Sequence, residues 1–232
     1  MFNFLFLPAF VTYNFLTFGI QKYFKVSPQI CTSLSIATNS ILVSSSSYLF
    51  INNRIDMPTM INSFQFTLAF MVNDLWFRNH NDMPQGYWVK VLHHILAGVG
   101  IYHFPRIGIL IPTLFLSEIS NIPLEIRNTM RHLKWKKYGI QGLMIALLYI
   151  SFGYLRIYHL PIYTWNYYQR GLMNNLDMFY FGSIYVLWCY WFLFINYKIA
   201  SLIKEKFSDF VSNKFKTIIQ DKNLLENFRK SK

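Results

Sequence analysis

Charged residues are scarce in this sequence, and acidic residues are the scarcest. Only 10 of the 232 residues are Asp or Glu, against 22 Lys or Arg, and charged residues make up 14% of the chain. Soluble domains contain about 25% charged residues. Hydrophobic residues reach 53% and aromatic residues 19%. This balance excludes an ordinary soluble globular protein and favours an all-α membrane protein whose outer face contacts lipid.

Cysteine and histidine clusters are also lacking. The 2 cysteines both lie in apolar segments and offer no disulfide or zinc framework. The 6 histidines include a single adjacent pair, unlike the repeated clusters of membrane desaturases. A metal site of one histidine with Asp74 and Glu118 is an open alternative, and a haem between His103 and His159 is a more remote one. The sequence predicts no metal and no other cofactor.

The net charge of +12 does not indicate a nucleic-acid partner, because the basic residues gather in short loops and the C-terminal tail. The sequence contains no DNA- or RNA-binding motif that would hold them in a groove. The first basic residue is Lys22, so the N-terminus lacks the basic start of a cleaved signal peptide. We expect the first apolar segment to be retained as a membrane helix.

Seven apolar segments are long enough, or nearly so, to cross about 30 Å of hydrocarbon. They are residues 2–21, 30–51, 59–77, 88–104, 106–126, 138–161 and 178–200. Pro105 predicts a break between the fourth and fifth segments, which would then form an antiparallel hairpin. The second segment is rich in serine, which predicts a helix packed closely against its neighbours.

The basic residues also predict an orientation. With the N-terminus outside and seven crossings, 18 basic residues fall on the inner side and 3 on the outer side, and Arg156 lies within the sixth segment. Positive charge stays on the cytoplasmic side. We therefore expect an outside, or lumenal, N-terminus and a cytoplasmic C-terminus.

Ionisable residues in three consecutive segments are predicted to lie at similar depths from the inner side. By helix rise, His93 and His94 are roughly 8–9 Å deep, Glu118 about 13 Å and Asp74 roughly 5 Å. Each costs about 2.5–3.5 kcal/mol in a bilayer, and such groups usually face a bundle interior or a cavity. One interpretation is an inward-opening cavity with a histidine as base or nucleophile and Glu118 orienting it. The alternative is a set of interhelical hydrogen bonds that fix the bundle.

A polar stripe extends this group along the fifth segment, and each nearby charge has a structural alternative. Ser117, Asn121, Glu125 and Asn128 share one helical face, and Pro112 and Pro123 should kink this helix. Asp74 and Arg78 are four residues apart, which also fits a local ion pair. Arg156 alternatively extends to the headgroups. Ala97 and Gly100 leave room beside His93 for a ligand chain or a close helix.

These residues resemble the TLC-domain family, which includes ceramide synthases and TRAM-type translocon proteins. The similarity covers roughly residues 55–200, and Arg156 in the sixth segment also fits it. Its motifs are Asp74 with Trp76, Leu92-His93-His94-Ile95-Leu96, Leu116-Ser117-Glu118-Ile119-Ser120-Asn121 and Leu124-Glu125. The resemblance implies six helices around a cavity plus an N-terminal helix.

We accordingly divide the chain into an N-terminal helix (1–25), a TLC-type domain (26–203) and a basic tail (204–232). The tail is either an amphipathic helix on the membrane or a solvated segment.

For ceramide synthases, the resemblance implies acyl transfer from acyl-CoA by the histidine pair and a following Asp-x-Ser-Asp. This chain keeps both histidines and Ser120, but has Glu118 and Asn121 in place of the two aspartates. It therefore looks nearer to the non-synthase members.

From this resemblance we expect a protein that binds, senses or modifies a membrane lipid in the endoplasmic reticulum or another intracellular membrane. The expected catalytic residues are His93, His94 and Glu118. The expected lipid-binding residues are Asp74, Ser117, Ser120, Asn121, Glu125 and Arg156. Two alternatives stay open: an N-acyltransferase that uses acyl-CoA as co-substrate, and a non-catalytic subunit that binds another membrane protein or a second copy.

Overall fold

The structure is a computed structural model that describes residues 5–81, 87–135 and 138–230. All regular secondary structure in these ranges is helical, which confirms the predicted all-α class. The chain divides into two compact units, Met1–Cys189 and Tyr190–Lys232. The first unit contains all the residues predicted to form the functional site.

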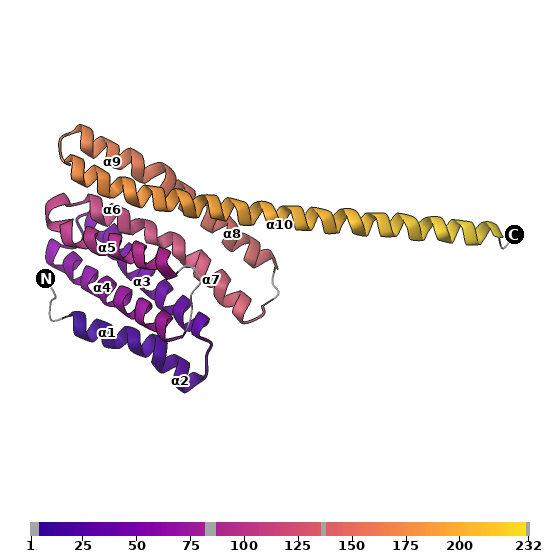
Figure 1. The fold of residues 1–232 in the computed structure, drawn as a ribbon, viewed down its shortest axis with the longest axis horizontal. Coiled ribbons are helices and arrows are strands. Elements are labelled where there is room, and N and C mark those ends of the chain that lie inside the picture. Colours follow the sequence, from indigo (N-terminus) through magenta and orange to yellow (C-terminus); the bar gives the residue numbers. More distant parts are fainter. Residues whose placement is uncertain (1–4, 82–86, 136–137, 231–232) are drawn as a thin grey trace. The chain divides into compact units, whose positions relative to one another are not determined.

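Within the described ranges, seven helical stretches follow the seven predicted segments (Figure 1). Three of the stretches contain irregular turns, labelled η. The elements are α1 (Phe6–Asn14), η1 (Phe15–Gly19), α2 (Ile20–Phe24), α3 (Pro28–Ile51), α4 (Met57–His80), α5 (Tyr87–Ile107), α6 (Leu110–Leu116), η2 (Ser117–Ser120), α7 (Asn121–His132), α8 (Tyr138–Phe152), η3 (Gly153–His159), α9 (Leu160–Gln169) and α10 (Asn175–Lys230).

Three parts of the described chain are long and apolar enough to cross a membrane. They are Pro28–Ile51, Gly139–Gln169 and Asn175–Ser201. This finding supports an integral membrane protein, and the count of seven crossings stays a prediction.

Local sequence explains where α3 and α4 begin. The Ser27 hydroxyl accepts a hydrogen bond from the backbone N–H of Ile30, and the Asp56 carboxylate accepts one from the backbone N–H of Thr59. Each cap is followed by a proline in the first turn of the helix, where a missing N–H costs nothing. These caps fix the starts of two neighbouring helices of the first unit.

The break between the fourth and fifth segments lies later than predicted. The corner was expected at His103–Arg106, but α5 continues through Pro105 to Ile107. Gly108 then adopts a φ of +64° and ends the helix. Glycine takes this left-handed conformation without a steric penalty, whereas a proline near a helix end removes only one backbone hydrogen bond.

Two helices contain irregular turns near the predicted polar residues. The fifth segment contains the 3₁₀ turn η2 between Pro112 and Pro123, and the helix continues to His132 instead of ending near residue 126. Pro123 has no N–H to offer the carbonyl of Ile119, which weakens the α-helical pattern at that point. The sixth segment contains the π-helical turn η3 and extends to Gln169.

The serine-rich helix α3 lies at the centre of the first unit, in contact with α4, α6, η2 and α7. Its buried face carries small polar side chains, namely Thr32, Ser33, Ser35, Asn39, Ser40, Ser44 and Ser47. The Ser44 hydroxyl donates to the backbone carbonyl of Phe115 on α6 (3.4 Å). The predicted packing helix is therefore confirmed, because small side chains let the neighbouring helices approach closely.

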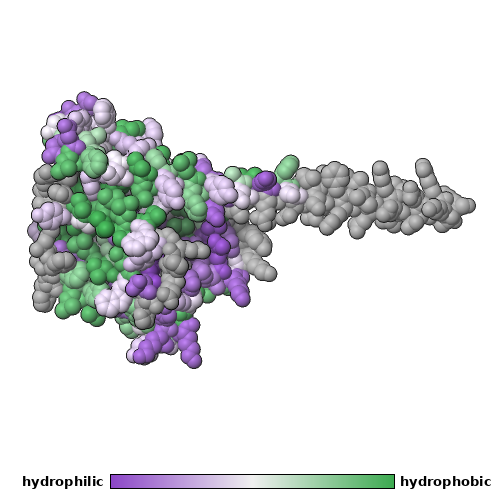
Figure 2. Space-filling view, in the orientation of Figure 1, coloured by the Kyte–Doolittle hydropathy of each residue, from purple (hydrophilic) through white to green (hydrophobic). Residues whose placement is uncertain are grey.

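The outer faces of the helices in the first unit are largely apolar. Large exposed side chains on four helices include Ile41, Val72, Ile150 and Val186. Figure 2 shows apolar side chains gathered over the visible face of this unit, with hydrophilic side chains toward the ends of α2 and α7. This distribution fits a surface that contacts lipid, since continuous exposed apolar area is costly in water.

The second unit contains the rest of α10, which is helical to Lys230. The Lys198 ammonium lies over the Phe194 ring at 5.3 Å from its centroid. The side chains after residue 208 lie outside the described set. The amphipathic character of the tail therefore stays a prediction.

Candidate functional site

Asp74, Arg78 and His94 form a buried polar cluster between α4 and α5. An Asp74 carboxylate oxygen lies 3.0 Å from Nε2 of His94, and Nε of Arg78 donates to both oxygens at 3.0 and 3.1 Å. Asp74 is 2% exposed and His94 is 7% exposed. The local ion pair considered from the sequence is present, and it holds the carboxylate that contacts the histidine.

The two nitrogens of His94 have different surroundings. A carboxylate oxygen only accepts hydrogen bonds, so Nε2 carries the proton that points at Asp74. Nδ1 is buried and has no hydrogen-bond partner among the described residues. The Phe70 ring packs edge-on against the imidazole, with centroids 5.9 Å apart. When the ring is neutral and Nε2 carries the proton, Nδ1 can only accept a hydrogen bond. The contact of Asp74 with Nε2 determines both this tautomer and the orientation of the ring.

His93 lies beside this cluster on α5. Its ring centroid is 5.6 Å from that of His94, and the two planes are inclined by 44°. His93 is half-buried. It therefore lies next to the Asp74 cluster, in contact with His94.

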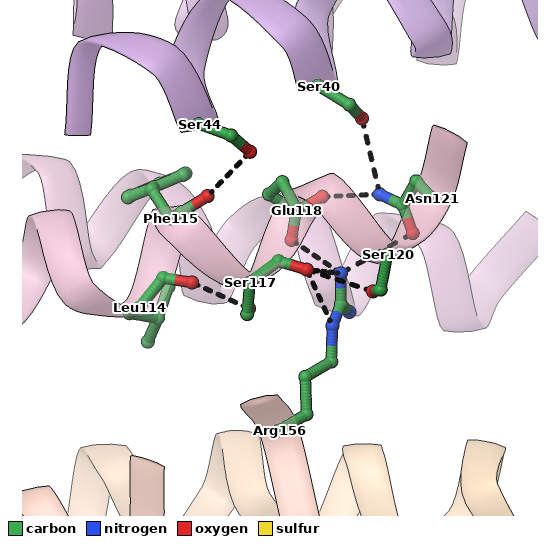
Figure 3. A network of polar contacts seen from close by, with 9 residues as sticks. All are labelled: Ser40, Ser44, Leu114, Phe115, Ser117, Glu118, Ser120, Asn121 and Arg156. Atoms are coloured by element: carbon green, nitrogen blue, oxygen red, sulfur yellow. Dashed lines mark hydrogen bonds and ion pairs between the residues drawn. The ribbon is translucent and has the colours of Figure 1, made fainter. Parts of the chain in front are cut away.

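A second polar group is a network around Glu118 and Arg156 (Figure 3). One Glu118 oxygen accepts from Arg156 at 3.1 Å, and the other accepts from the Asn121 amide at 2.5 Å. The Arg156 guanidinium also donates to the backbone carbonyl of Ser117 (3.2 Å) and to the Asn121 side chain (3.4 Å). The Asn121 amide reaches Ser40 on α3 at 3.5 Å. The network thus joins α3, the η2–α7 segment and η3.

Arg156 is enclosed by this network and by two aromatic rings. Its guanidinium lies 4.9 Å from the Phe152 centroid and 5.2 Å from that of Trp188. The residue is 1% exposed. The alternative in which Arg156 extends to the headgroups is wrong, because the π-helical turn η3 directs the side chain to Glu118 and to the Ser117 carbonyl.

The structure separates the predicted site residues into these two groups. The carboxylate in contact with a histidine is Asp74, where we expected Glu118. The Ser120 hydroxyl donates to the Ser117 carbonyl at 2.8 Å, and Glu125 accepts from the Asn128 amide at 3.4 Å. In the described ranges no three His, Cys, Asp or Glu side chains form a group that could hold a metal ion.

Two aromatic residues complete the site, and the sequence did not single them out. The Tyr180 hydroxyl donates to the Leu96 carbonyl at 2.8 Å and lies against Gly100. A Cβ at Gly100 would collide with that hydroxyl. The space expected beside His93 is thus occupied by α10 at this level. Trp188 covers Arg156 from the same helix. Each was one more aromatic residue in an aromatic-rich segment, and only the small size of Gly100 indicated a close neighbour.

A cavity of about 530 Å³ lies elsewhere, near the end of α4 and the start of α5. Leu75, Trp76, Asn79 and Tyr87 line it. None of the predicted catalytic or lipid-binding residues is among them. The expected inward-opening cavity around the histidines therefore stays a prediction.

A helical bundle with an apolar outer face and buried charged clusters defines an integral membrane protein. A family model, TLC domain, matches residues 28–204. The chain belongs to the TLC-domain family, which links it to lipid metabolism or sensing. No curated protein and no solved structure matches the chain.

Proposed function

We propose that this protein binds a membrane lipid within its helical bundle and that His94 is the residue that contacts the lipid. One observation carries the proposal: Nδ1 of His94 is buried without a partner among the described residues, while Nε2 is fixed by Asp74. A buried polar atom without a partner costs about 1–3 kcal/mol. A ligand that supplies the missing hydrogen bond recovers this free energy.

The open nitrogen selects the chemistry of the lipid. As a lone-pair acceptor it requires a donor, such as the hydroxyl, amine or amide N–H of a lipid backbone. Asp74 is paired with Arg78 at 3.0 Å, and its contact with Nε2 directs the proton on that nitrogen away from the ligand. A lipid that offers only ester oxygens at this level would leave Nδ1 unsatisfied.

The remaining predicted residues fit a supporting role in this proposal. Glu118, Asn121 and Arg156 satisfy one another, and Ser117, Ser120 and Glu125 bond within their own helices. We assign them to holding α3, the η2–α7 segment and η3 in place around the lipid. His93, half-buried beside His94, is assigned to the lining of the same site.

We further propose the orientation expected from the basic residues, in which the C-terminus is cytoplasmic. The membrane is proposed to be that of the endoplasmic reticulum or another intracellular compartment. Glycosylation acceptor sites engineered separately at each end provide the test. Modification at the N-terminus alone is the expected result, and modification at the C-terminus would reverse the orientation.

Photo-crosslinking to the purified full chain tests lipid binding. The probe is a photoactivatable, alkyne-tagged sphingoid base, which carries both amine and hydroxyl donors. We expect His94→Ala to lower crosslinking about tenfold or more, as the loss of a buried hydrogen bond of about 1.4 kcal/mol predicts. His159→Ala, which removes a half-buried histidine of η3 that belongs to neither polar group, is the matched control. Equal crosslinking of the wild type and His94→Ala would reject the proposed contact.

Acyl transfer is the second candidate, favoured by the Asp74–His94 pair, because a histidine oriented by a carboxylate is the usual general base. In this reaction the nitrogen of the lipid amine attacks the thioester carbonyl of acyl-CoA, and Nδ1 of His94 takes the proton that the amine loses. An amide forms, and the thiolate of CoA leaves and recovers the proton. Conversion of labelled acyl-CoA to an N-acyl lipid by wild type, abolished in His94→Ala, is the required result. If the lipid probe crosslinks to the protein but no N-acyl lipid forms, the result would support lipid binding and exclude acyl transfer.

A further inference from the structure

We propose that the C-terminal end of α7 and the turn that follows it bind the phosphate of an anionic phospholipid in the cytoplasmic leaflet. The site consists of Arg127, Arg131 and Lys134, with Trp135 at its edge. It is separate from the His94 site, and its placement in the cytoplasmic leaflet rests on the orientation proposed above.

Helix length places these residues at the level of the headgroups. The helical stretch from Leu110 to His132, which includes the 3₁₀ turn η2, is about 35 Å long at 1.5 Å per residue. The hydrocarbon core is about 30 Å thick. A rod that begins at one face of the core therefore extends its last turn into the opposite headgroup layer, where lipid phosphates lie.

The charges at this end have no counter-ion within the described residues. Arg131 and Lys134 are exposed and form no side-chain hydrogen bond or ion pair there. The Nε atom of Arg127 is buried and also lacks a partner in this part of the chain. The one acid on α7, Glu125, is buried and accepts from Asn128. Three neighbouring cations without an acid create a local positive charge that attracts an anion from outside.

The turn after α7 holds the site in a defined geometry. Lys134 adopts a φ of +56°, and the backbone N–H of Trp135 returns to the carbonyl of Met130 (2.9 Å). The Gln141 amide donates to the carbonyl of Trp135 at 2.6 Å, which ties the turn to α8. Trp135 itself is 57% exposed. A tryptophan held at this level is typical of the membrane–water interface.

The neighbouring side chains favour a lipid over a soluble anion or a protein. Ile126 and Leu133 are both exposed beside the cations. A phospholipid provides a phosphate for the basic residues and acyl chains for the apolar ones. Basic side chains near the cytoplasmic leaflet attract its anionic lipids, with about 1 kcal/mol per charge.

Competition between lipids tests the proposal. The full chain is purified in detergent, and binding of phosphatidylserine and phosphatidylcholine is compared by native mass spectrometry. We expect the wild type to prefer phosphatidylserine. Arg131→Gln/Lys134→Gln should lose the preference by about tenfold or more, since two charges are removed. Adding inorganic phosphate at constant ionic strength should leave the preference unchanged if the site requires a lipid.

Two controls make the result specific. Lys22→Gln/Lys25→Gln removes two charges from another basic turn and should keep the preference. Arg131→Lys/Lys134→Arg keeps the charges and should keep it as well. No preference in the wild type, the same loss in the Lys22 and Lys25 variant, or an unchanged preference in Arg131→Gln/Lys134→Gln would each overturn the proposal. Displacement by phosphate would also overturn it, in favour of a soluble ligand.

Discussion

The two buried polar groups of this protein differ in how completely they are satisfied. Around Glu118, both carboxylate oxygens, the Arg156 guanidinium and the Asn121 side chain bond to one another, and two aromatic rings cover the cation. Around Asp74, the carboxylate is satisfied by Arg78 and His94, but the outer nitrogen of His94 is not. A closed network stabilises the bundle, whereas an open one can accept a ligand.

The strongest test of this comparison removes the cation from the closed network. Arg156→Leu leaves the Glu118 carboxylate buried without its counter-ion, so we expect a loss of about 3–5 kcal/mol in the free energy of unfolding. Denaturant unfolding of the purified protein in detergent measures it. Glu118→Leu/Arg156→Leu should recover much of the loss. If the single and double variants were equally unstable, the network would stabilise by shape and not by charge.

The contact between α5 and α10 should be next in magnitude. Gly100→Ala places a methyl group where the Tyr180 hydroxyl lies, and such overpacking costs about 1–3 kcal/mol. The midpoint of denaturant unfolding reports the change. Gly98→Ala is the matched control, since the nearest atom to its added Cβ is a Leu68 methyl at 3.8 Å. A loss confined to Gly98→Ala would contradict the packing described for α10.

Substitution of His94 should affect lipid binding more than stability, whereas substitution of Arg156 should mainly affect stability. His94→Ala removes one hydrogen bond of about 1 kcal/mol from Asp74, which keeps its bonds to Arg78. We expect the lipid contact to be lost while the protein stays folded. Unfolding and lipid crosslinking measured on the same preparation separate the two outcomes. A collapse of stability as large as that of Arg156→Leu would remove the distinction between the two groups.

The smallest effect should come from a charge that belongs to neither group. Hydrogen bonds from the side chain and the backbone of Thr59 hold the pKa of Asp56 below its usual value. A lowered pKa in the folded state stabilises the protein above the unfolded pKa of about 3.9 and ceases to do so as the pH falls through the folded value. The stability difference between the wild type and Asp56→Asn should therefore shrink in acid. If the stability difference between the wild type and Asp56→Asn grew as the pH fell, the ionised Asp56 carboxylate would not be the group that stabilises the start of α4.

The helical stretches were predictable because each apolar run between polar turns has the length of a membrane helix. The end of α5 could not be predicted in the same way. Pro105 is a stronger helix-breaking signal in the sequence than Gly108, although Gly108 is the residue that ends the helix. The polar residues themselves were predictable from the cost of burying them. Their pairing was not: Asp74 and Glu118 have similar predicted depths, and only the side-chain directions decide which of them faces His94.

The π-helical turn η3 has a consequence for the register of the sixth helix. A π turn accommodates one more residue than an α turn, so it offsets everything after Gly153–His159 against everything before it. If the same residues closed as an ordinary α-helix, α9 would rotate relative to α8 by about 100°. Thr164, now buried, would then turn toward the outside. The wide turn thus allows Arg156 and Thr164 to be buried in one continuous helical stretch.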